Sequence, residues 1–277
     1  MSKKKNKQWL IFTDMDGSLL DHFTYQFDEA THSLQTLAKH KIPVIPITSK
    51  TQAELEQLRD DLNNHHPFII ENGAAVFIPK GYFIEQPLDT TETDDYWIKS
   101  FVKPRETWQQ LITKIRSRYE GKFITFAEAG LDGIVEMTGL KSDQASKASQ
   151  RQYGEPLSWQ GNCIDKRDFI RDLENMGANI LEGGRFLHVS GKCDKGLALT
   201  WLKNVFQNQV PEQEVTTLAL GDSGNDIAML ETADCAVLIR SPVHELPIVK
   251  RNEGLFVTTS TGPKGWSEGI SNFILTD

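Results

Sequence analysis

Cysteine is scarce in this chain, and its three residues, Cys163, Cys193 and Cys235, form no C-x-x-C pair. So few and so scattered thiols argue against both a disulfide framework and a zinc cluster. Long apolar runs are also missing, because no stretch approaches the roughly 18 residues of a membrane span. The basic start lacks the apolar core of a signal peptide. We therefore expect a cytoplasmic protein without a membrane partner.

Positive charge is in deficit, since the formal net charge is -8 at pH 7. This balance disfavours nucleic acid as a partner, and the lysines at positions 3–5 are expected to form a solvated tail. An anionic substrate would have to be held by a few placed cations. The length of 277 residues favours two domains, and the sequence leaves the oligomeric state open.

Apolar runs alternate with segments of helical spacing in both the first and the last part of the chain. Continuous apolar strands separated by helices predict a parallel sheet covered on both faces, a doubly wound α/β core. The strands are expected around residues 9–12, 43–48, 215–221, 235–239 and 255–259. The pair Asn72-Gly73 predicts a short hairpin turn within residues 67–79.

The sequence pattern changes between residues 86 and 189, where connecting segments rich in Pro, Thr and Asp appear. This region predicts an inserted α+β domain with an antiparallel sheet, which leaves residues 1–85 and 190–277 for the core. Its expected elements are a helix at 108–119, strands at 123–128, 133–139, 179–182 and 185–191, a polar loop at 141–156, and a two-glycine hairpin turn at 182–185.

Polar residues follow three of the predicted core strands. In an open parallel sheet, ligands bind beyond the carboxyl ends of the strands, so these tips would converge if the strands are neighbours. Each tip alone could be an ordinary turn or helix cap. The tip residues are Asp14, Asp16, Thr48, Ser49, Asp222, Asn225 and Asp226.

Four carboxylates at one dry edge would repel each other unless a cation neutralised them. Ligands that offer only oxygen favour Mg²⁺ over Zn²⁺, and an EF-hand calcium loop would need glycine where Leu19 stands. Lys195 is the first residue of a predicted helix, where its positive charge is unfavourable beside the helix dipole. This position therefore indicates that Lys195 has an anionic partner such as phosphate. The chain contains no Walker, dinucleotide-binding, G-x-S-x-G or H-E-x-x-H motif.

The stretches "DMDGS", "ITSK", "DKG" and "GDSGND", in this order, resemble the four motifs of the haloacid dehalogenase (HAD) superfamily of phosphatases. The insertion between the second and third motifs resembles the cap domain of the branch that acts on sugar phosphates. The strings "ENGAAVF", "RQYGEP" and "GGRFLHVSG" look most like the mannosyl-3-phosphoglycerate phosphatase family. The resemblance implies a HAD-like core and a Mg²⁺-dependent phosphoric monoester hydrolase.

The resemblance also implies the role of each motif residue. Asp14 would be the nucleophile that forms an aspartyl-phosphate, and Asp16 would be the general acid and base. Thr48 would bind the transferring phosphoryl oxygens and Lys195 would offset their charge. Mg²⁺ would be held by the Asp14 carboxylate, the Asp16 carbonyl and Asp222, with Asp226 as a further ligand or support.

The substrate contacts are expected mainly in the inserted domain. A guanidinium suits a glyceryl carboxylate and polar groups suit sugar hydroxyls, so the candidates are Ser49, Arg151, Glu155, Arg185 and His188. Two alternatives stay open. One is a phosphatase for other sugar phosphates, such as sucrose or trehalose phosphate, and the other is a non-catalytic regulator that binds metal or phosphate. The sequence does not separate mannosyl from glucosyl substrates.

Overall fold

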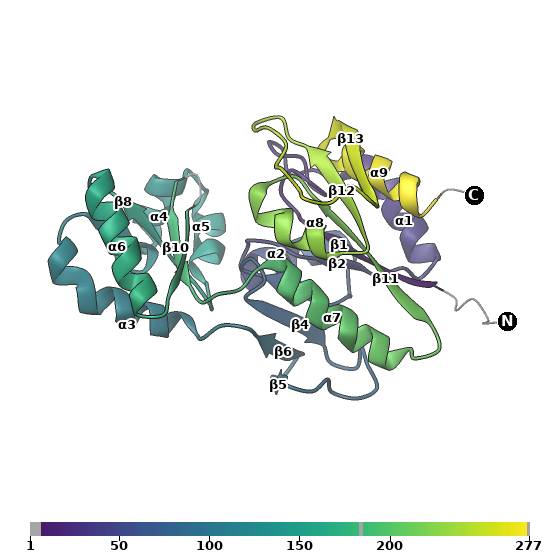
Figure 1. Cartoon of the computed structure of the whole chain (residues 1–277), viewed down its shortest axis with the longest axis horizontal. Helices are drawn as coiled ribbons and strands as arrows, with labels where there is room; N and C mark the ends of the chain where they lie inside the picture. Colours follow the sequence, from purple (N-terminus) through teal and green to yellow (C-terminus); the bar gives the residue numbers. More distant parts are fainter. Residues whose placement is uncertain (1–6, 183–184, 276–277) are drawn as a thin grey trace. The chain divides into compact units, whose positions relative to one another are not determined.

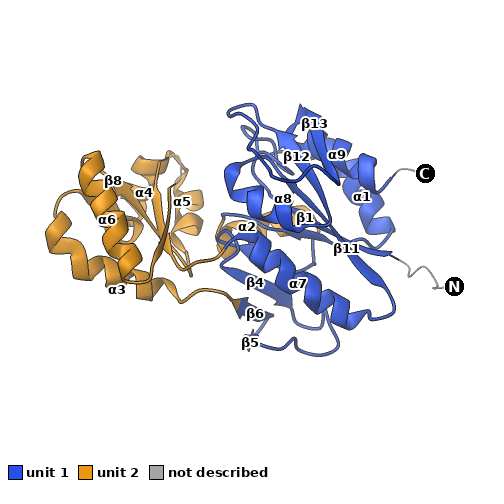
Figure 2. Ribbon diagram, in the orientation of Figure 1, with its two compact units in different colours: residues 1–49, 64–99, 194–277 blue, residues 50–63, 100–193 orange. Residues whose placement is uncertain are grey.

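The computed structural model describes residues 7–182 and 185–275. They form two compact units, shown in different colours in Figure 2: residues 7–49, 64–99 and 194–275 belong to the first, and residues 50–63, 100–182 and 185–193 to the second. The predicted inserted domain, 86–189, overlaps the second unit, which leaves out residues 86–99 and also includes residues 50–63. The chain has no helix, within the described ranges, that is long and apolar enough to cross a membrane.

A five-stranded parallel sheet forms the centre of the first unit, in the order β13-β12-β11-β1-β2. Its strands are β1 (Lys7–Thr13), β2 (Val44–Pro46), β11 (Glu214–Gly221), β12 (Cys235–Arg240) and β13 (Leu255–Thr261). The second half of β1 and nearly all of β11 are buried, as a sheet covered on both faces requires. The predicted doubly wound core is confirmed (Figure 1).

Helices of the first unit pack on this sheet, α9 against β12 and β13, and α7 and α8 against β11. Their bounds are α1 (Thr31–Lys39), α7 (Lys195–Gln209), α8 (Ile227–Thr232) and α9 (Gly262–Phe273), with short 3-10 turns η1 (Asp28–Ala30) and η3 (Gly224–Asp226). The predicted hairpin is present as β3 (Phe68–Ile70) and β4 (Ala75–Pro79). It belongs to a second sheet, β3-β4-β6-β5, with β5 (Thr91–Glu92) and β6 (Tyr96–Ser100).

The second unit is an α+β structure around an antiparallel sheet in the order β7-β8-β10-β9. The strands are β7 (Phe123–Thr125), β8 (Glu155–Trp159), β9 (Asn179–Glu182) and β10 (Leu187–Ser190). The helices are α2 (Gln52–Asp61), α3 (Arg105–Ile115), η2 (Arg116–Tyr119), α4 (Phe126–Thr138), α5 (Ser142–Ser149) and α6 (Cys163–Asn175). The glycines of the predicted hairpin turn, residues 183–184, lie outside the described residues.

Three predictions for this region are wrong in whole or in part. The strand expected at 123–128 ends at Thr125, where helix α4 begins with a capping box in which Thr125 and Glu128 exchange hydrogen bonds with each other's backbone. Residues 133–139 were also expected as a strand, but residues 133–138 form the last part of α4. Residues 141–156 were expected as a loop but contain α5, where Ala145 and Ala148 are buried three positions apart on one helix face. The polar sequence of α5 hid that helix.

Candidate active site

The site lies where the strand order of the parallel sheet reverses direction. The chain runs from β1 to β2 on one side, and β11, β12 and β13 follow on the other side of β1. Asp14 comes directly after β1 and Asp222 directly after β11. Because β1 and β11 are paired in parallel, these two aspartates leave the sheet at the same edge. The predicted convergence of these tips is therefore present.

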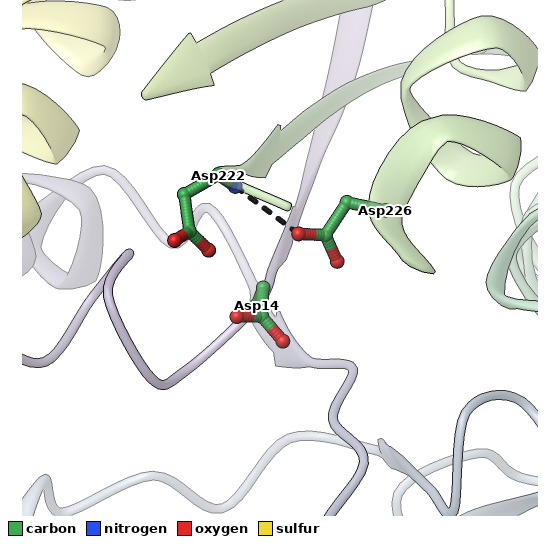
Figure 3. A group of neighbouring side chains, drawn as sticks. All are labelled: Asp14, Asp222 and Asp226. Carbon is green, nitrogen blue, oxygen red and sulfur yellow. Dashed lines mark hydrogen bonds between the residues drawn. The ribbon is translucent and has the colours of Figure 1, made fainter. Parts of the chain in front are cut away.

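Three carboxylates meet at this edge. Asp14, Asp222 and Asp226 each have an oxygen atom within 4.8 Å of an oxygen of the other two, and all three residues are buried. Figure 3 shows the three side chains turned toward one another. The Asp226 carboxylate also accepts hydrogen bonds from the backbone N–H groups of Asp222 at 3.1 Å and Ser223 at 3.0 Å, which fixes the turn after β11.

Lys195 provides the positive charge at the cluster. Its ammonium donates to Asp14 Oδ1 and to Asp226 Oδ1, both at 2.6 Å, and its side chain is fully buried. Lys195 is the first residue of α7, and Asp194 caps that helix by accepting from the Leu197 N–H at 2.7 Å. The cation is thus placed by a capped helix start and stabilised there by two carboxylates.

Asp222 is held on several sides. Ser18 donates to its Oδ1 at 3.3 Å, and His244 Nε2 lies 3.3 Å from its Oδ2. Gly17 has φ of +79°, and a Cβ at this position would stand 2.6 Å from Asp222 Oδ2, so only glycine leaves room for the carboxylate. Sequence reasoning missed His244, because it comes from a loop after β12 that carries no motif.

The ionisation of the cluster reflects its burial. Burial and the charge of Asp226 raise the pKa of Asp14 well above its ordinary value, although Lys195 opposes the rise. The same two causes raise the pKa of Asp222 to about 6. Burial disfavours the charged ammonium, but Asp14 and Asp226 outweigh it and raise the pKa of Lys195 above its usual range. One ammonium does not balance three carboxylates, so the site favours a further cation.

The cluster suits Mg²⁺. Its donors are carboxylate oxygens that converge from separate loops, with no sulfur or imidazole among the three, and a hard divalent ion prefers such donors. Asp16 is not one of the three, although it is half-buried and two residues from Asp14. Its predicted contribution to the ion, through its carbonyl, stays a prediction.

Thr48 lies at the tip after β2, the strand that pairs with β1. It is almost fully buried, and its N–H donates to the Ile69 carbonyl at 3.0 Å. The preceding residue, Ile47, donates its N–H to the Thr13 carbonyl at 2.8 Å, so the tips after β1 and β2 are adjacent. Ser49 follows and is half-buried.

The remaining predicted contacts belong to the second unit. Arg151 lies close enough to His188 to act on it electrostatically, since burial and the Arg151 charge lower the pKa of His188 to about 4. Arg185 is exposed and donates to the Thr138 carbonyl at 3.0 Å. Glu155 is fully buried.

The Glu155 carboxylate is held inside the second unit. It accepts hydrogen bonds from Arg105 Nε at 2.5 Å, Gln109 Nε2 at 2.8 Å and the Ala127 N–H at 3.0 Å. These bonds join α3 and the start of α4 to β8, which is an organising role within the fold. Direct contact of Glu155 with a substrate stays a prediction.

Two curated relatives match almost the whole chain. Both are named glucosyl-3-phosphoglycerate/mannosyl-3-phosphoglycerate phosphatase. The protein from Methanococcoides burtonii is 36% identical over 271 residues, which cover 96% of this chain and 97% of the relative. The protein from Persephonella marina is 37% identical over 266 residues, which cover 94% and 95%. The chain belongs to this family of HAD phosphatases.

Family models and solved structures agree with this membership. A model described as haloacid dehalogenase-like hydrolase matches residues 11–112, and one described as sucrose-6F-phosphate phosphohydrolase matches residues 174–274. The fold is similar to that of a HAD phosphatase from Bacteroides thetaiotaomicron, with a TM-score of 0.68 at 15% identity over 99% of this chain and 97% of that one. A sucrose-phosphatase from Synechocystis gives 0.61 at 15% over 96% and 98%.

This HAD phosphatase is therefore a phosphoric monoester hydrolase, as the four motifs predicted. The motif residues Asp14, Lys195, Asp222 and Asp226 are brought together in one cluster, and Thr48 lies at the neighbouring strand tip. Their individual roles in the reaction stay predictions.

A stability measurement would test the electrostatics of the cluster. The raised pKa of Asp222 means that its ionisation opposes folding. This cost is absent below the ordinary pKa of an aspartate, grows as the pH rises from that value to about 6, and is complete above about pH 6. We expect Asp222→Asn to be more stable than wild type by on the order of 1–3 kcal/mol at pH 8 in EDTA, and the gain to shrink at pH 5.

Scanning calorimetry at both pH values would measure this difference. Saturating Mg²⁺ should reverse the order, because only the wild type keeps all the charged ligands that the ion stabilises. A variant less stable than wild type in EDTA at pH 8 would contradict the account of the cluster.

Proposed function

We propose that this HAD phosphatase hydrolyses mannosyl- or glucosyl-3-phosphoglycerate to the glycosylglycerate and phosphate. The observation that carries the proposal is the near-complete match to two relatives that bear both substrates in their name, together with the intact cluster of Asp14, Lys195, Asp222 and Asp226. A general sugar-phosphate phosphatase is the second candidate, since residues 174–274 match the sucrose-6F-phosphate phosphohydrolase model.

Asp14 is the proposed nucleophile. Its carboxylate attacks phosphorus and displaces the alkoxide of the substrate, while Asp16 gives that oxygen a proton. Asp16 then takes a proton from the water that attacks the aspartyl-phosphate, which releases inorganic phosphate and restores Asp14. Lys195 favours the ionised form of Asp14 that attacks, since it donates to that carboxylate at 2.6 Å and lowers its pKa, and Thr48 holds the phosphoryl oxygens.

Asp14, Asp222 and Asp226 are the side chains that would hold Mg²⁺, with the Asp16 carbonyl as a further ligand. When bound, the ion would offset the charge of the phosphoryl oxygens and of the carboxylates. In this proposal, Ser49 and the second-unit residues Arg151, Arg185 and His188 bind the rest of the substrate. The pKa of His188, lowered to about 4, makes its ring neutral at pH 7, which suits a sugar hydroxyl rather than a carboxylate.

A phosphate-release screen tests the function. The substrates are mannosyl- and glucosyl-3-phosphoglycerate, sucrose 6-phosphate, trehalose 6-phosphate and free hexose phosphates, each with Mg²⁺ and with EDTA. The proposal expects the two glycosyl phosphoglycerates to have the highest kcat/KM, and EDTA to stop their hydrolysis. Preference for sucrose 6-phosphate would favour the second candidate, and full activity of an ion-free sample would remove the metal from the proposal.

Asp16→Asn tests the acid role through the leaving group. A sugar or glyceryl alkoxide needs a proton to leave, so we expect kcat on the glycosyl phosphoglycerate to fall about 10²- to 10⁴-fold. An aryl phosphate has a better leaving group, and its deficit should be much smaller. Steady-state kinetics on both substrates would measure the difference, and equal losses would mean that Asp16 is not the acid.

Truncation of the arginines tests binding of the glyceryl carboxylate. Arg151→Ala or Arg185→Ala should cost about 1.5–3 kcal/mol of transition-state stabilisation, or about ten- to more than a hundredfold in kcat/KM, if that side chain binds the carboxylate. An aryl phosphate lacks this group, so its hydrolysis should hardly change. Arg167→Ala, at an exposed position on α6, is the matched control. Uniform loss on both substrates would assign the arginine to folding instead.

A further inference from the structure

Three consecutive residues between β3 and β4 adopt a left-handed backbone. The φ angles are +46° for Glu71, +60° for Asn72 and +92° for Gly73. This region is unfavourable for residues with a Cβ, and two of the three carry one. A two-residue hairpin turn needs a positive φ at two positions at most, so this turn is more strained than a hairpin requires.

The backbone of this turn holds Thr48. The Asn72 N–H donates to the Thr48 carbonyl at 2.9 Å, and the Thr48 N–H donates to the Ile69 carbonyl at 3.0 Å. Both peptide groups of Thr48 are therefore bound to the same short segment. The Asn72 N–H therefore pairs with the strand tip after β2.

The side chain of the same residue reaches the turn after β11. Asn225 Nδ2 donates to Asn72 Oδ1 at 3.0 Å. Asn225 lies in η3 between Asp222 and Asp226, and its Oδ1 in turn accepts from the Ser223 hydroxyl. Asn72 thus contacts two strand tips of the site, one through its backbone and one through its side chain.

Gly73 brings the turn against the start of α7. A Cβ at this position would stand 2.2 Å from the Asp194 carbonyl oxygen and 3.0 Å from the Lys195 N atom. Only glycine permits this approach, which places the turn beside the residue that presents the buried ammonium. The three-residue turn therefore touches segments that carry Thr48, Lys195 and Asn225.

We propose that Asn72 is a positioning residue of this phosphatase, which keeps Thr48 and Asn225 in register with the Asp14 cluster. The strained turn is the structural cost of joining these segments at one point. This inference rests on the proposed function, because it assigns Asn72 to the same site and reaction. It differs from a purely structural role in its expected effect on stability.

Asn72→Gly separates the two contributions. Glycine keeps the N–H that binds Thr48 and relieves the left-handed strain, but it removes the side chain that binds Asn225. We expect the melting temperature to stay equal or rise, and kcat to fall about 3- to 10-fold on both the glycosyl phosphoglycerate and an aryl phosphate, the usual worth of one hydrogen bond. KM should change less than about twofold. Asn72→Ala should show the same kcat loss with a lower melting temperature.

Lys41→Gly is the matched control, because Lys41 is also left-handed, with φ of +57°, and is exposed in the turn between α1 and β2. It should leave kcat unchanged. The double variant Asn72→Gly/Asn225→Ala should be no slower than the slower of its single variants if the two side chains act as one contact. Wild-type kcat in Asn72→Gly, or losses that simply add in the double variant, would overturn the inference.

Asp14→Asn, assayed in parallel, distinguishes this failure from failure of the proposed function. If Asp14→Asn is inactive and Asn72→Gly is as fast as wild type, the site stands and Asn72 has no positioning role. If Asp14→Asn turns over normally, the proposed reaction itself is wrong.

Discussion

Asp14→Asn is expected to fold normally and to lose turnover by on the order of 10⁴-fold or more, because an amide cannot attack phosphorus to form an acyl-phosphate. The substitution keeps the shape of the side chain and its place after β1. It removes one of three buried carboxylates whose charges oppose each other, as the raised pKa of Asp14 indicates. The variant should therefore be at least as stable as wild type in EDTA.

Phosphate release under single-turnover conditions and calorimetry would measure both effects. Asp28→Asn is the control, since Asp28 is exposed in η1. That variant should keep wild-type kinetics. An Asp14→Asn enzyme with normal kcat would rule out covalent catalysis at this residue, whereas an unfolded variant would show that the carboxylate is needed for the fold.

Lys195→Met is expected to lower both activity and stability. Methionine has a similar length but cannot donate, so it breaks both 2.6 Å bonds, and the cluster loses its buried ammonium. The pKa of Asp14 should rise further, because Lys195 is the group that lowers it. We expect kcat/KM to fall about 10²- to 10³-fold. The acid limb of the pH profile should move to higher pH, since Asp14 must lose its proton to attack.

Stability should also respond to Lys195→Met. The Lys195 pKa is raised by the fold, so its contribution is complete at neutral pH and is lost only in strongly alkaline solution. Removal of one partner of a buried ion pair costs about 3–5 kcal/mol, and Mg²⁺ should restore part of it. Lys203→Met is the matched control, because Lys203 is on the same helix and pairs with the more exposed Asp234 at 2.8 Å. Equal losses in the two variants would contradict the role of Lys195.

The candidate catalytic residues could be predicted because most of them directly follow predicted β-strands in the sequence. Asp14, Thr48 and Asp222 each follow a short apolar run, and parallel pairing of those runs brings their ends to one edge. The side chains at these tips converge whenever the strands are neighbours in the sheet. Lys195 was recognisable because a lysine at a helix start has no local reason to be there.

The parts that could not be predicted depend on tertiary contacts or on weak local signals. The position of His244 beside Asp222 follows from the course of a loop without regular structure. The buried bonds of Glu155 depend on how α3 and α4 pack against β8. By contrast, the T-x-x-E start of α4 at residues 125–128 was present in the sequence, but it lay inside the stretch 123–128 that was predicted as a strand.

Chemical trapping of the intermediate tests the central claim most directly. The enzyme is quenched in acid during turnover of the glycosyl phosphoglycerate, reduced with borohydride, which converts an aspartyl-phosphate to homoserine, and digested for mass spectrometry. The account predicts homoserine at position 14 in samples with substrate, and none without substrate or in Asp14→Asn. Homoserine at another position, or full phosphate release without any reducible aspartate, would contradict it.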